Sequence, residues 1–291
     1  MTGGSYLLAG CGRVGGRLLA AEQAAARALS ILSRDPLRRS AELAAGVTAW
    51  FEADLDRGAP SDPPPSFSGV WYLVPPPGEG RSDPRLRRFL EWLEPAPPRR
   101  LVLVSTTGVY GDCGGAWVDE GRRPDPATDR ARRRLDAEGA LRQWCDARGV
   151  QWVILRVAGI YGPGMLPEGR LRRSEPVLQA AEAPWSNRIH VEDLVQALQA
   201  AMHRPEAAGL YNATDGNPTT MTDYFNRVAD HLGLPRPPEI GRAEARRRLS
   251  GGMLSYLSES KRLSNRRLVE QLGVRLRYPT LEKGLPPADD A

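Results

Sequence analysis

The chain has 291 residues, 41% of them hydrophobic, which suits one large α/β domain or a nucleotide domain with a smaller lobe. Its apolar runs fall well short of the roughly 20 residues that cross a bilayer, and its N-terminus lacks the pattern of a secretory signal, so we expect a soluble, cytoplasmic protein with no membrane partner. The net charge of +5 comes with acidic residues interleaved among the arginines, which argues against nucleic acid as a partner.

The three cysteines, Cys11, Cys113 and Cys145, are scattered along the chain and have no CxxC spacing. This pattern indicates neither a disulfide framework nor a zinc site, and we expect no metal. We interpret all three as free thiols.

The first predicted elements are a buried strand and a helix, joined by a glycine-rich turn within residues 5–19. The turn has the GxGxxG spacing, which permits a tight bend and lets backbone N–H groups approach a dinucleotide pyrophosphate at the helix N-terminus. The alternative is a turn without function in a glycine-rich chain, but the apolar strand and helix around it favour a nucleotide site. The expected contacts to the pyrophosphate are Gly10, Gly12, Arg13, Val14 and Gly15.

A second parallel strand is predicted over residues 28–33 and ends at Ser33 and Arg34. In a Rossmann unit, the end of this strand meets the adenosine ribose, where an acidic residue selects the 2′-hydroxyl and an arginine accommodates a 2′-phosphate. Ser33 and Arg34 therefore favour NADP over NAD. The alternative is that Arg34 only flanks a following helix, which Asp35 would cap with Pro36 in its first turn.

A third strand is predicted over residues 47–52. Asp54 and Leu55 follow it at a position where such folds often touch the adenine. The proline-rich residues 58–68 predict an exposed loop.

A fourth buried strand is predicted over residues 69–74, and three prolines from Pro75 onward stop it. This would place Val74 and Pro75 at the carboxyl edge of the sheet, beside the cofactor. Asp83 and Pro84 predict the start of a helix. Its apolar face is Leu86, Phe89, Leu90 and Leu93.

A fifth strand runs into a hydroxyl-rich loop over residues 101–112, with the sequence LVLVSTTGVYGD. Three further segments follow in order: LRVAGIYGPG at 155–164, NRIHVEDL at 187–194 and YPTLEKGL at 278–285. With these motifs, the chain resembles the extended, atypical branch of the short-chain dehydrogenase/reductase superfamily, the NAD-dependent epimerase/dehydratase family.

The resemblance implies an α/β fold, a Rossmann-type doubly wound parallel sheet with a smaller C-terminal α/β substrate lobe. We expect the nucleotide domain over residues 1–158, with a contribution from 187–213. The smaller lobe would comprise 159–186 and 214–285, followed by a tail, 286–291. The resemblance also implies NADP or NAD as cofactor and a small-molecule substrate bound between the two parts.

In that superfamily, a serine or threonine after the fifth strand hydrogen-bonds the reacting oxygen, which makes Thr106 the candidate here, with Ser105 beside the cofactor. The main catalytic pair is a tyrosine and a lysine four residues later on the next helix. In the segment that resembles this helix, Arg130 stands in the tyrosine position and Arg134 in the lysine position. Arginine, whose pKa exceeds ~12, does not readily exchange a proton, so the chain resembles members that lack most active-site residues.

No lysine precedes Lys261, so no other alignment of the nucleotide domain restores the pair. Tyr256 precedes Lys261 by five residues in a late polar segment, and we set this pair aside. Gly159 stands where many epimerases have a substrate-binding asparagine, which argues against a nucleotide-sugar substrate. For Cys113, a reactive thiol is considered, but an inert one is the default.

Four other side chains are candidates near the site. Tyr110 is a surrogate acid/base candidate, although a structural role for it and for Tyr161 is favoured. Arg188 and His190 precede a helix with an acidic start and are assigned, with Tyr161, to the substrate lobe. His190 is expected to titrate near neutral pH, with a packing or substrate-contact role favoured over that of a general base.

The remaining periodicity predicts helices over 192–203, 222–232, 242–249 and 264–272, and a strand over 210–213. Two functions remain open. One is an NADP-preferring oxidoreductase or epimerase/dehydratase acting on an unidentified small molecule. The other is a catalytically inactive NADP-binding regulatory or sensor protein. By analogy with relatives, a homodimer would form through the helices near 83–93 and 128–148.

Overall fold

The computed structural model describes residues 5–27, 29–34 and 46–285. The predicted helix after Asp35 and the tail 286–291 lie outside these ranges. In the described ranges, none of the helices has the length and low charge that a membrane span requires.

A seven-stranded parallel sheet forms the centre of the larger part, with the order β12-β7-β5-β4-β1-β2-β3. Its strands are β1 (Tyr6–Ala9), β2 (Leu29–Ser33), β3 (Val47–Glu52), β4 (Gly69–Tyr72), β5 (Arg100–Thr106), β7 (Gln151–Val157) and β12 (Gly209–Ala213). The strand order reverses beside β1, whose neighbours are β2 and β4. Such a switch point opens a crevice at the carboxyl ends of the strands, where ligands bind in open α/β sheets.

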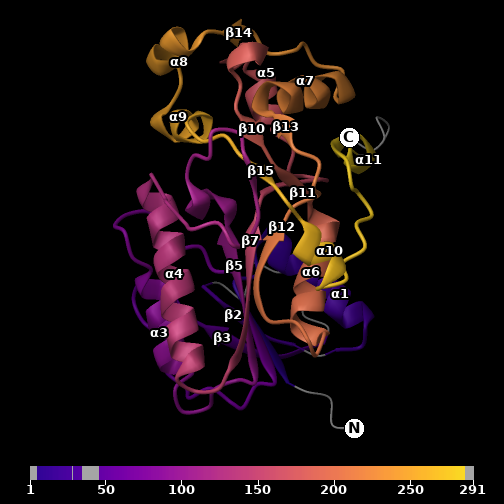
Figure 1. The fold of residues 1–291 in the computed structure, drawn as a ribbon. Helices are drawn as coiled ribbons and strands as arrows, with labels where there is room; N and C mark the ends of the chain where they lie inside the picture. The colour runs from indigo at the N-terminus through magenta and orange to yellow at the C-terminus, as the bar shows by residue number, and fades with distance from the viewer. Residues whose placement is uncertain (1–4, 28, 35–45, 286–291) are drawn as a thin grey trace.

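Helices cover both faces of this sheet, as Figure 1 shows. One face carries α1 (Arg13–Ala24) and α6 (Val191–His203), and the other carries α3 (Pro84–Trp92) and α4 (Asp129–Asp146). Side chains alternate between the two faces, so that Leu8 packs with α1 and α6 while Leu7 packs with α3 and α4. Burial on both faces explains why the strands are almost continuously apolar in the sequence. The predicted doubly wound fold is confirmed.

A smaller part lies at the carboxyl end of the sheet, at the top of Figure 1. Its helices are α5 (Glu168–Arg172), α7 (Met221–His231), α8 (Arg242–Arg248) and α9 (Gly251–Leu257). Short strand pairs accompany them: β8 (Gly159–Tyr161) with β11 (Arg188–His190), β9 (Val177–Leu178) with β14 (Glu239–Ile240), and β10 (Trp185–Ser186) with β13 (Thr219–Thr220). Its own apolar cluster includes Leu171, Tyr224 and Val228.

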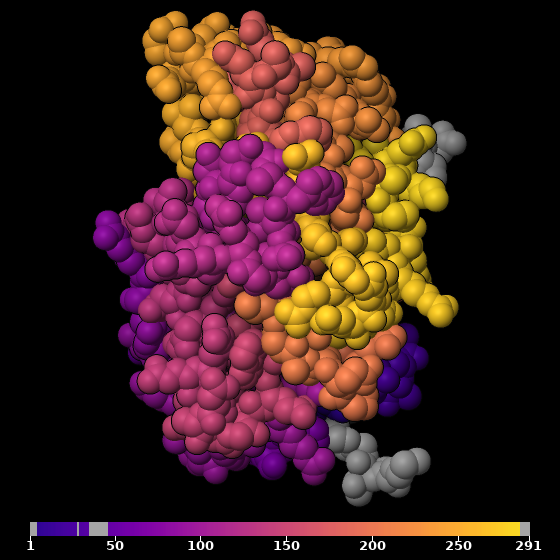
Figure 2. All heavy atoms as spheres, viewed as in Figure 1, coloured from indigo at the N-terminus to yellow at the C-terminus, as the bar shows by residue number. Residues whose placement is uncertain are grey.

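The C-terminal segment joins the two parts. Strand β15 (Arg262–Leu263) pairs with β6 (Trp117–Val118), which follows the 3-10 turn η1 (Thr107–Tyr110). Beyond it, α10 (Arg266–Glu270) packs beside β12, and α11 (Leu281–Gly284) returns to the smaller part. Figure 2 shows this segment, in yellow, lying across the junction on the right of the view.

Two predicted elements differ in extent from the structure, and one helix was not predicted. The fourth strand ends at Tyr72 instead of Val74, because its neighbour β1 stops at Ala9, where Gly10 with φ +89° turns the chain away. The helix predicted over 264–272 spans only Arg266–Glu270. Helix α9 was not predicted, because its seven residues include two glycines and show little periodicity.

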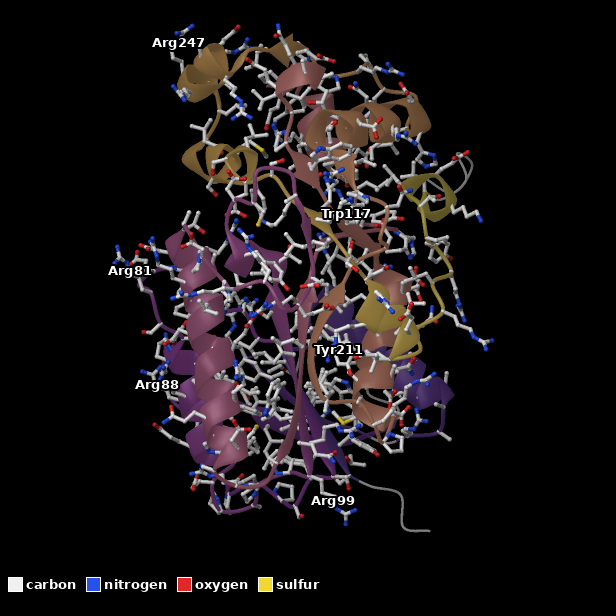
Figure 3. All side chains as sticks on the ribbon, in the orientation of Figure 1. Arg81, Arg88, Arg99, Trp117, Tyr211 and Arg247 are labelled. Atoms are coloured by element: carbon white, nitrogen blue, oxygen red, sulfur yellow. The ribbon has the colours of Figure 1, made fainter. Side chains whose placement is uncertain are left out.

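Basic side chains are spread over the whole surface. Figure 3 shows Arg247 at the end of the smaller part, Arg99 at the opposite end of the sheet and Arg81 on the outer side of α3 and α4. Many surface arginines form ion pairs with nearby carboxylates, for example Arg81 with Asp129. These three arginines are therefore far apart and do not form one basic patch.

Candidate functional site

A cavity of about 620 Å³ lies at the carboxyl ends of β1, β2 and β4, where the strand order reverses. This volume is within the range of cofactor pockets. Eight of the predicted cofactor residues line it: Gly10, Gly12, Ser33, Arg34, Asp54, Leu55, Val74 and Pro75. Sequence reasoning missed six others: Cys11, Gly16, Leu32, Ala53, Leu73 and Arg85.

The glycine turn has the close packing that its spacing predicts. A Cβ on Gly10 would lie 2.8 Å from the backbone nitrogen of Val74, and a Cβ on Gly15 would lie 2.5 Å from the carbonyl oxygen of Gly10. Both contacts are too close for any side chain. Gly12, by contrast, faces open space.

Helix α1 begins at this turn without a side-chain cap. Gly12 is its N-cap, no side chain accepts a hydrogen bond from its first turn, and that turn has no acidic residue. The free N–H groups and the positive end of the helix dipole therefore remain available to an anion in the cavity.

Four predicted cofactor residues are not among those that line the cavity. Arg13 Nη1 donates to the Gly164 carbonyl at 3.1 Å, and Val14 packs against the core. Gly15 contacts the turn itself. Ser105 Oγ donates to Glu138 Oε1 at 2.6 Å in the interior, so it does not face the cavity.

The end of the cavity next to β2 contains an unsatisfied hydroxyl. The Oγ atom of Ser33 is buried and has no hydrogen-bond partner among the described residues. Nearby, Arg85 Nε donates to Asp56 Oδ1 at 2.6 Å, and its Nη2 pairs with the second carboxylate oxygen. These hydrogen bonds from Arg85 lower the pKa of Asp56.

A second cavity, of about 310 Å³, forms a cleft between the sheet and the smaller part. The chain brings to it the turn after β5, the first turn of α4 and four segments of the smaller part. Of the predicted residues, Thr106, Arg130 and Arg188 line this cleft, whereas Tyr110, Arg134, Tyr161 and His190 do not. Thr106 Oγ1 accepts from the Gly108 backbone nitrogen at 3.3 Å, so its proton is free to be donated.

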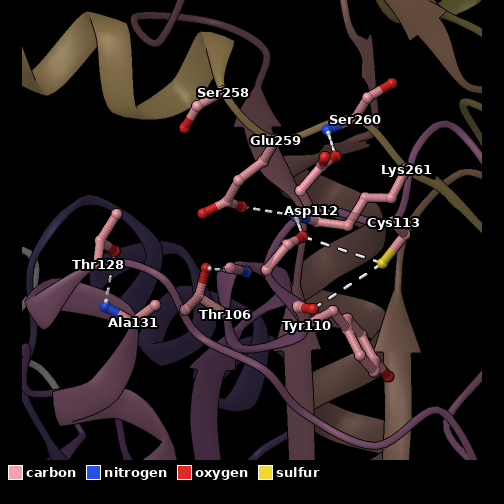
Figure 4. A network of polar contacts seen from close by, with 12 residues as sticks. Thr106, Tyr110, Asp112, Cys113, Thr128, Ala131, Ser258, Glu259, Ser260 and Lys261 are labelled. Atoms are coloured by element: carbon pink, nitrogen blue, oxygen red, sulfur yellow. Dashed lines mark hydrogen bonds and ion pairs between the residues drawn. The ribbon is translucent and has the colours of Figure 1, made fainter.

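Tyr256 and Lys261, which sequence analysis set aside as a catalytic pair, also line the cleft. The guanidinium of Arg130 lies 4.2 Å from the centre of the Tyr256 ring, a cation–π contact. Lys261 is 6% exposed, and its Nζ donates to the Gly111 carbonyl at 2.7 Å and pairs with Glu259 Oε2 at 2.6 Å. Figure 4 shows Glu259 and Lys261 close to the loop that carries Thr106.

Arg188 lies deep in the cleft. Its guanidinium lies 4.0 Å from the centre of the Tyr224 ring, and its Nη1 donates to the Asn187 carbonyl at 2.8 Å. Burial lowers its pKa. The cleft is therefore lined by a buried cation, Arg188, and by the aromatic ring of Tyr224.

Arg134 contacts backbone carbonyls on β5 and just after β4, and it does not line the cleft. Its Nη1 donates to the Val104 carbonyl at 3.1 Å and approaches that of Val74 at 3.5 Å. Burial lowers the pKa of this arginine. It is one turn beyond Arg130 on α4, and the two side chains have different surroundings.

The two tyrosines of the Tyr-Gly motifs are internal. Tyr110 OH donates to Asn212 Oδ1 at 2.7 Å, and Tyr161 OH donates to the Thr280 carbonyl at 3.2 Å. Burial raises the pKa of both phenols. Neither hydroxyl is placed to exchange a proton in the cleft.

The expectation that His190 titrates near neutral pH is wrong. The ring is 2% exposed, its Nδ1 accepts from the Glu192 backbone nitrogen at 3.2 Å, and it stacks on Tyr278. Burial and the charge of Arg17 lower its pKa to about 4. His190 is therefore neutral at pH 7 and serves as the N-cap of α6.

Cys113 lies beside the same loop, half-buried. Its Sγ approaches the carbonyls of Tyr110 and Gly111, both at 3.9 Å (Figure 4). Burial raises the pKa of this thiol, which favours the inert interpretation. Within the described residues, no group of acidic, histidine or cysteine side chains has the arrangement of a metal site.

Comparison with known proteins identifies relatives across the chain. Residues 86–213 match the NAD dependent epimerase/dehydratase family. Protein YeeZ of Escherichia coli (strain K12) is 28% identical over 180 residues, which are 62% of this chain and 59% of YeeZ. The match thus spans less than two thirds of the length of this curated relative.

Solved structures match over nearly the whole chain. A functionally unknown conserved protein from Silicibacter pomeroyi DSS is 32% identical, with a TM-score of 0.80 and coverage of 97% of this chain and 96% of that one. MoeE5, in complex with UDP-glucose and NAD, is 23% identical, with a TM-score of 0.75 and the same coverage, and shows the same fold. Residues 86–213 of this chain therefore form a domain of the NAD-dependent epimerase/dehydratase family, and the chain as a whole has the fold of solved epimerase structures.

Proposed function

We propose that this protein binds a nicotinamide dinucleotide at the glycine turn and acts as an NADP-preferring epimerase/dehydratase-like oxidoreductase on a small molecule in the adjoining cleft. The observation that carries the proposal is the uncapped N-terminus of α1, which opens on a cavity of cofactor size. The relative MoeE5, which has NAD and UDP-glucose bound, has the same fold, and this supports a cofactor of that kind.

The cavity residues fit such a cofactor. The pyrophosphate would sit at Gly12 and the first N–H groups of α1, where a Cβ would have open space. The unpaired Ser33 hydroxyl would bind the ribose, and Asp54 with Leu55 would contact the adenine. The nicotinamide supplies the hydride chemistry.

NADP preference rests on the end of β2. There Ser33 is followed by the exposed Arg34, and both line the cavity. An arginine at this position accommodates a 2′-phosphate, whereas an acidic residue would select the 2′-hydroxyl of NAD.

The cleft has groups that orient a substrate and move a proton. The Thr106 hydroxyl would donate to the reacting oxygen of the substrate, and the Tyr256 phenol, whose ring lies against the Arg130 guanidinium, would supply an exchangeable proton. Arg188 would bind an anionic part of the substrate.

The second candidate function is a protein that binds NADP without turnover, as a regulator or sensor. Arg130, which lines the cleft on the first turns of α4, favours it, because a guanidinium does not readily transfer a proton. A homodimer through α3 and α4, which pack side by side on one face, is also proposed (Figure 1). Light scattering in solution would measure that state.

Thermal denaturation with NAD, NADH, NADP or NADPH tests the cofactor assignment. We expect the phosphorylated pair to raise Tm more than the other pair, and Arg34→Asp to abolish this preference while leaving the response to NAD. Absence of a shift with any of the four would refute cofactor binding. If the cofactor does bind, consumption of NADPH in the presence of carbonyl compounds distinguishes an enzyme from a sensor.

A further inference from the structure

A second arginine lines the cofactor cavity, and it pairs with a neighbouring carboxylate; the proposed function uses neither group. Arg85 comes from the first turn of α3 and lines the cavity, whereas Arg34 follows β2. Both lie near Asp56, whose pKa is lowered chiefly by hydrogen bonds from Arg85 and also by the charge of Arg34. The carboxylate of Asp56 is therefore paired with a cation on α3, and the charge of Arg34, which follows β2, also acts on it.

The donors of Arg85 are already engaged. Nε and Nη2 form a two-pronged pair with the carboxylate of Asp56, and Nη1 donates to the carbonyls of Pro75 at 2.8 Å and Pro76 at 3.3 Å. The Arg85 side chain is 16% exposed. Arg85 is thus held in place and is not free to grasp a phosphate.

Asp56 is also held in position, and it is 42% exposed. Arg88 Nη1 donates to the carbonyls of Leu55 at 2.7 Å and Asp56 at 3.1 Å, which fixes the loop after β3. A carboxylate at this point would repel a phosphate bound at Arg34, unless its charge is compensated. Arg85 supplies that compensation.

We infer that the Asp56–Arg85 ion pair sets the cofactor preference: Arg85 neutralises the Asp56 carboxylate and leaves Arg34 free to bind the 2′-phosphate of NADP. This inference rests on the proposed function, because it concerns the same cavity. Arg85 is a positioning and specificity residue that acts through Asp56. If Arg85 contacted the phosphate itself, removal of Asp56 would not compensate for the loss of Arg85. If Arg85 acts through Asp56, removal of Asp56 does compensate.

Binding of NADP and NAD, measured by titration calorimetry, tests this on four proteins: the unaltered chain, Arg85→Gln, Asp56→Asn and the double variant. We expect Arg85→Gln to weaken NADP by about fivefold, the equivalent of one exposed ion pair, and NAD much less. In the double variant, the exposed carboxylate is gone, so most of the NADP affinity should return. Asp56→Asn alone should leave NADP binding equal or tighter.

A matched control is Arg87→Gln on the same helix. Arg87 pairs with Asp136 at 2.6 Å and does not line the cofactor cavity, so its loss should leave the ratio of NADP to NAD affinity unchanged. Rising salt should weaken NADP more than NAD in the unaltered protein.

Three results would overturn the inference. Equal weakening of both cofactors by Arg85→Gln would mean that Arg85 only shapes the cavity through Pro75 and Pro76. If NADP affinity did not recover in the double variant, Arg85 would contact the phosphate directly. Tight NAD binding with no preference for NADP would refute this inference together with the NADP preference, but would leave the dinucleotide site in place. Binding of neither cofactor would refute the whole proposed function.

Discussion

Asp215 is a buried carboxyl whose titration affects the stability of the fold. It is 5% exposed, and its Oδ1 accepts from the Asn217 backbone nitrogen at 2.9 Å. Burial raises its pKa to about 7 from the ordinary 3.8, although the nearby Arg188 opposes this. Between these two values, the unfolded chain has released the proton while the folded protein retains it. Stability contributed by this group therefore falls as pH rises through that window.

The variant Asp215→Asn should remove this pH dependence. The amide keeps an oxygen for the Asn217 nitrogen but does not ionise. Relative to the unaltered protein, the variant should gain up to about 1.4 kcal/mol per pH unit between about pH 4 and about pH 7, and nothing further above this window. Urea denaturation at a series of pH values measures the difference.

His190 provides an internal control for that experiment. Its pKa of about 4 lies below the ordinary 6.5, so its contribution to stability is lost as pH falls through the same interval, opposite to that of Asp215. Both proteins contain His190, so its effect cancels in their difference. A difference that stayed constant with pH would contradict the role assigned to Asp215.

The sequence predicts the structural roles of some residues but not of others. Gly10 and Gly15 could be predicted, because their roles depend on a turn of a few residues. Arg85 was missed in the cavity, because only the folded sheet brings α3 next to the loop after β3. Ser105 was misjudged because its partner, Glu138, depends on packing. For His190 the favoured packing role could be predicted, but its low pKa depends on burial and could not.

At the scale of elements, a buried ion pair connects α4 to two strands. Glu138 on α4 accepts from Arg156 Nη2 on β7 at 2.7 Å and from Ser105 Oγ on β5 at 2.6 Å. The two charged side chains are each 3% exposed, and the Arg156 guanidinium lies 4.7 Å from the centre of the Tyr110 ring. The pair positions the strand end next to Thr106.

Glu138→Gln should destabilise the protein by about 3 kcal/mol, because it leaves the Arg156 charge buried without a counter-charge. Replacing both partners by Leu and Met of similar volume should cost much less, because no isolated charge then remains. Chemical denaturation of the two variants and the unaltered protein measures this. If the double variant were less stable than Glu138→Gln, the pair itself would be a net source of stability.

Long elements were predictable and short ones were not. The strands of the central sheet are apolar runs, and α3, α6 and α7 have clear apolar periodicity, with a cap such as Asp83 for α3. Helix α4 has little such periodicity and was placed by the resemblance. The two-residue pair β6 and β15 has none, yet it determines the cleft, because it brings Lys261 beside Gly111. Partners about 150 positions apart in sequence leave no local pattern.

At the scale of the whole molecule, contacts from several segments fasten the smaller part to the sheet. Arg17 Nη2 on α1 donates to the Pro163 carbonyl at 2.9 Å, and Arg13 contacts Gly164 beside it. On the other side of the cleft, Lys261 binds Gly111. The chain also passes between the two parts several times, so separation of the parts requires many contacts to break together.

Cofactor binding should therefore stabilise the smaller part although the cofactor cavity lies at the sheet. At a cofactor concentration of about 100 times Kd, mass action adds about 2.7 kcal/mol to the free energy of unfolding. If the molecule opens as one unit, amide hydrogen exchange should slow by the same factor, about 100-fold, in β4 and in the distant α7. Mass spectrometry of peptides from both elements, with and without NADP, measures the two factors.

The control for this coupling is Arg17→Gln, which removes the donor to Pro163 and the ion pair with Glu192. Arg17 does not line the cofactor cavity, so β4 should remain protected by NADP. Protection of α7 should decrease, because the smaller part then opens more often by itself. Exchange in α7 that NADP leaves unchanged in the unaltered protein would show that the two parts unfold independently. The cleft between them would then close through substrate contacts and not through the cofactor.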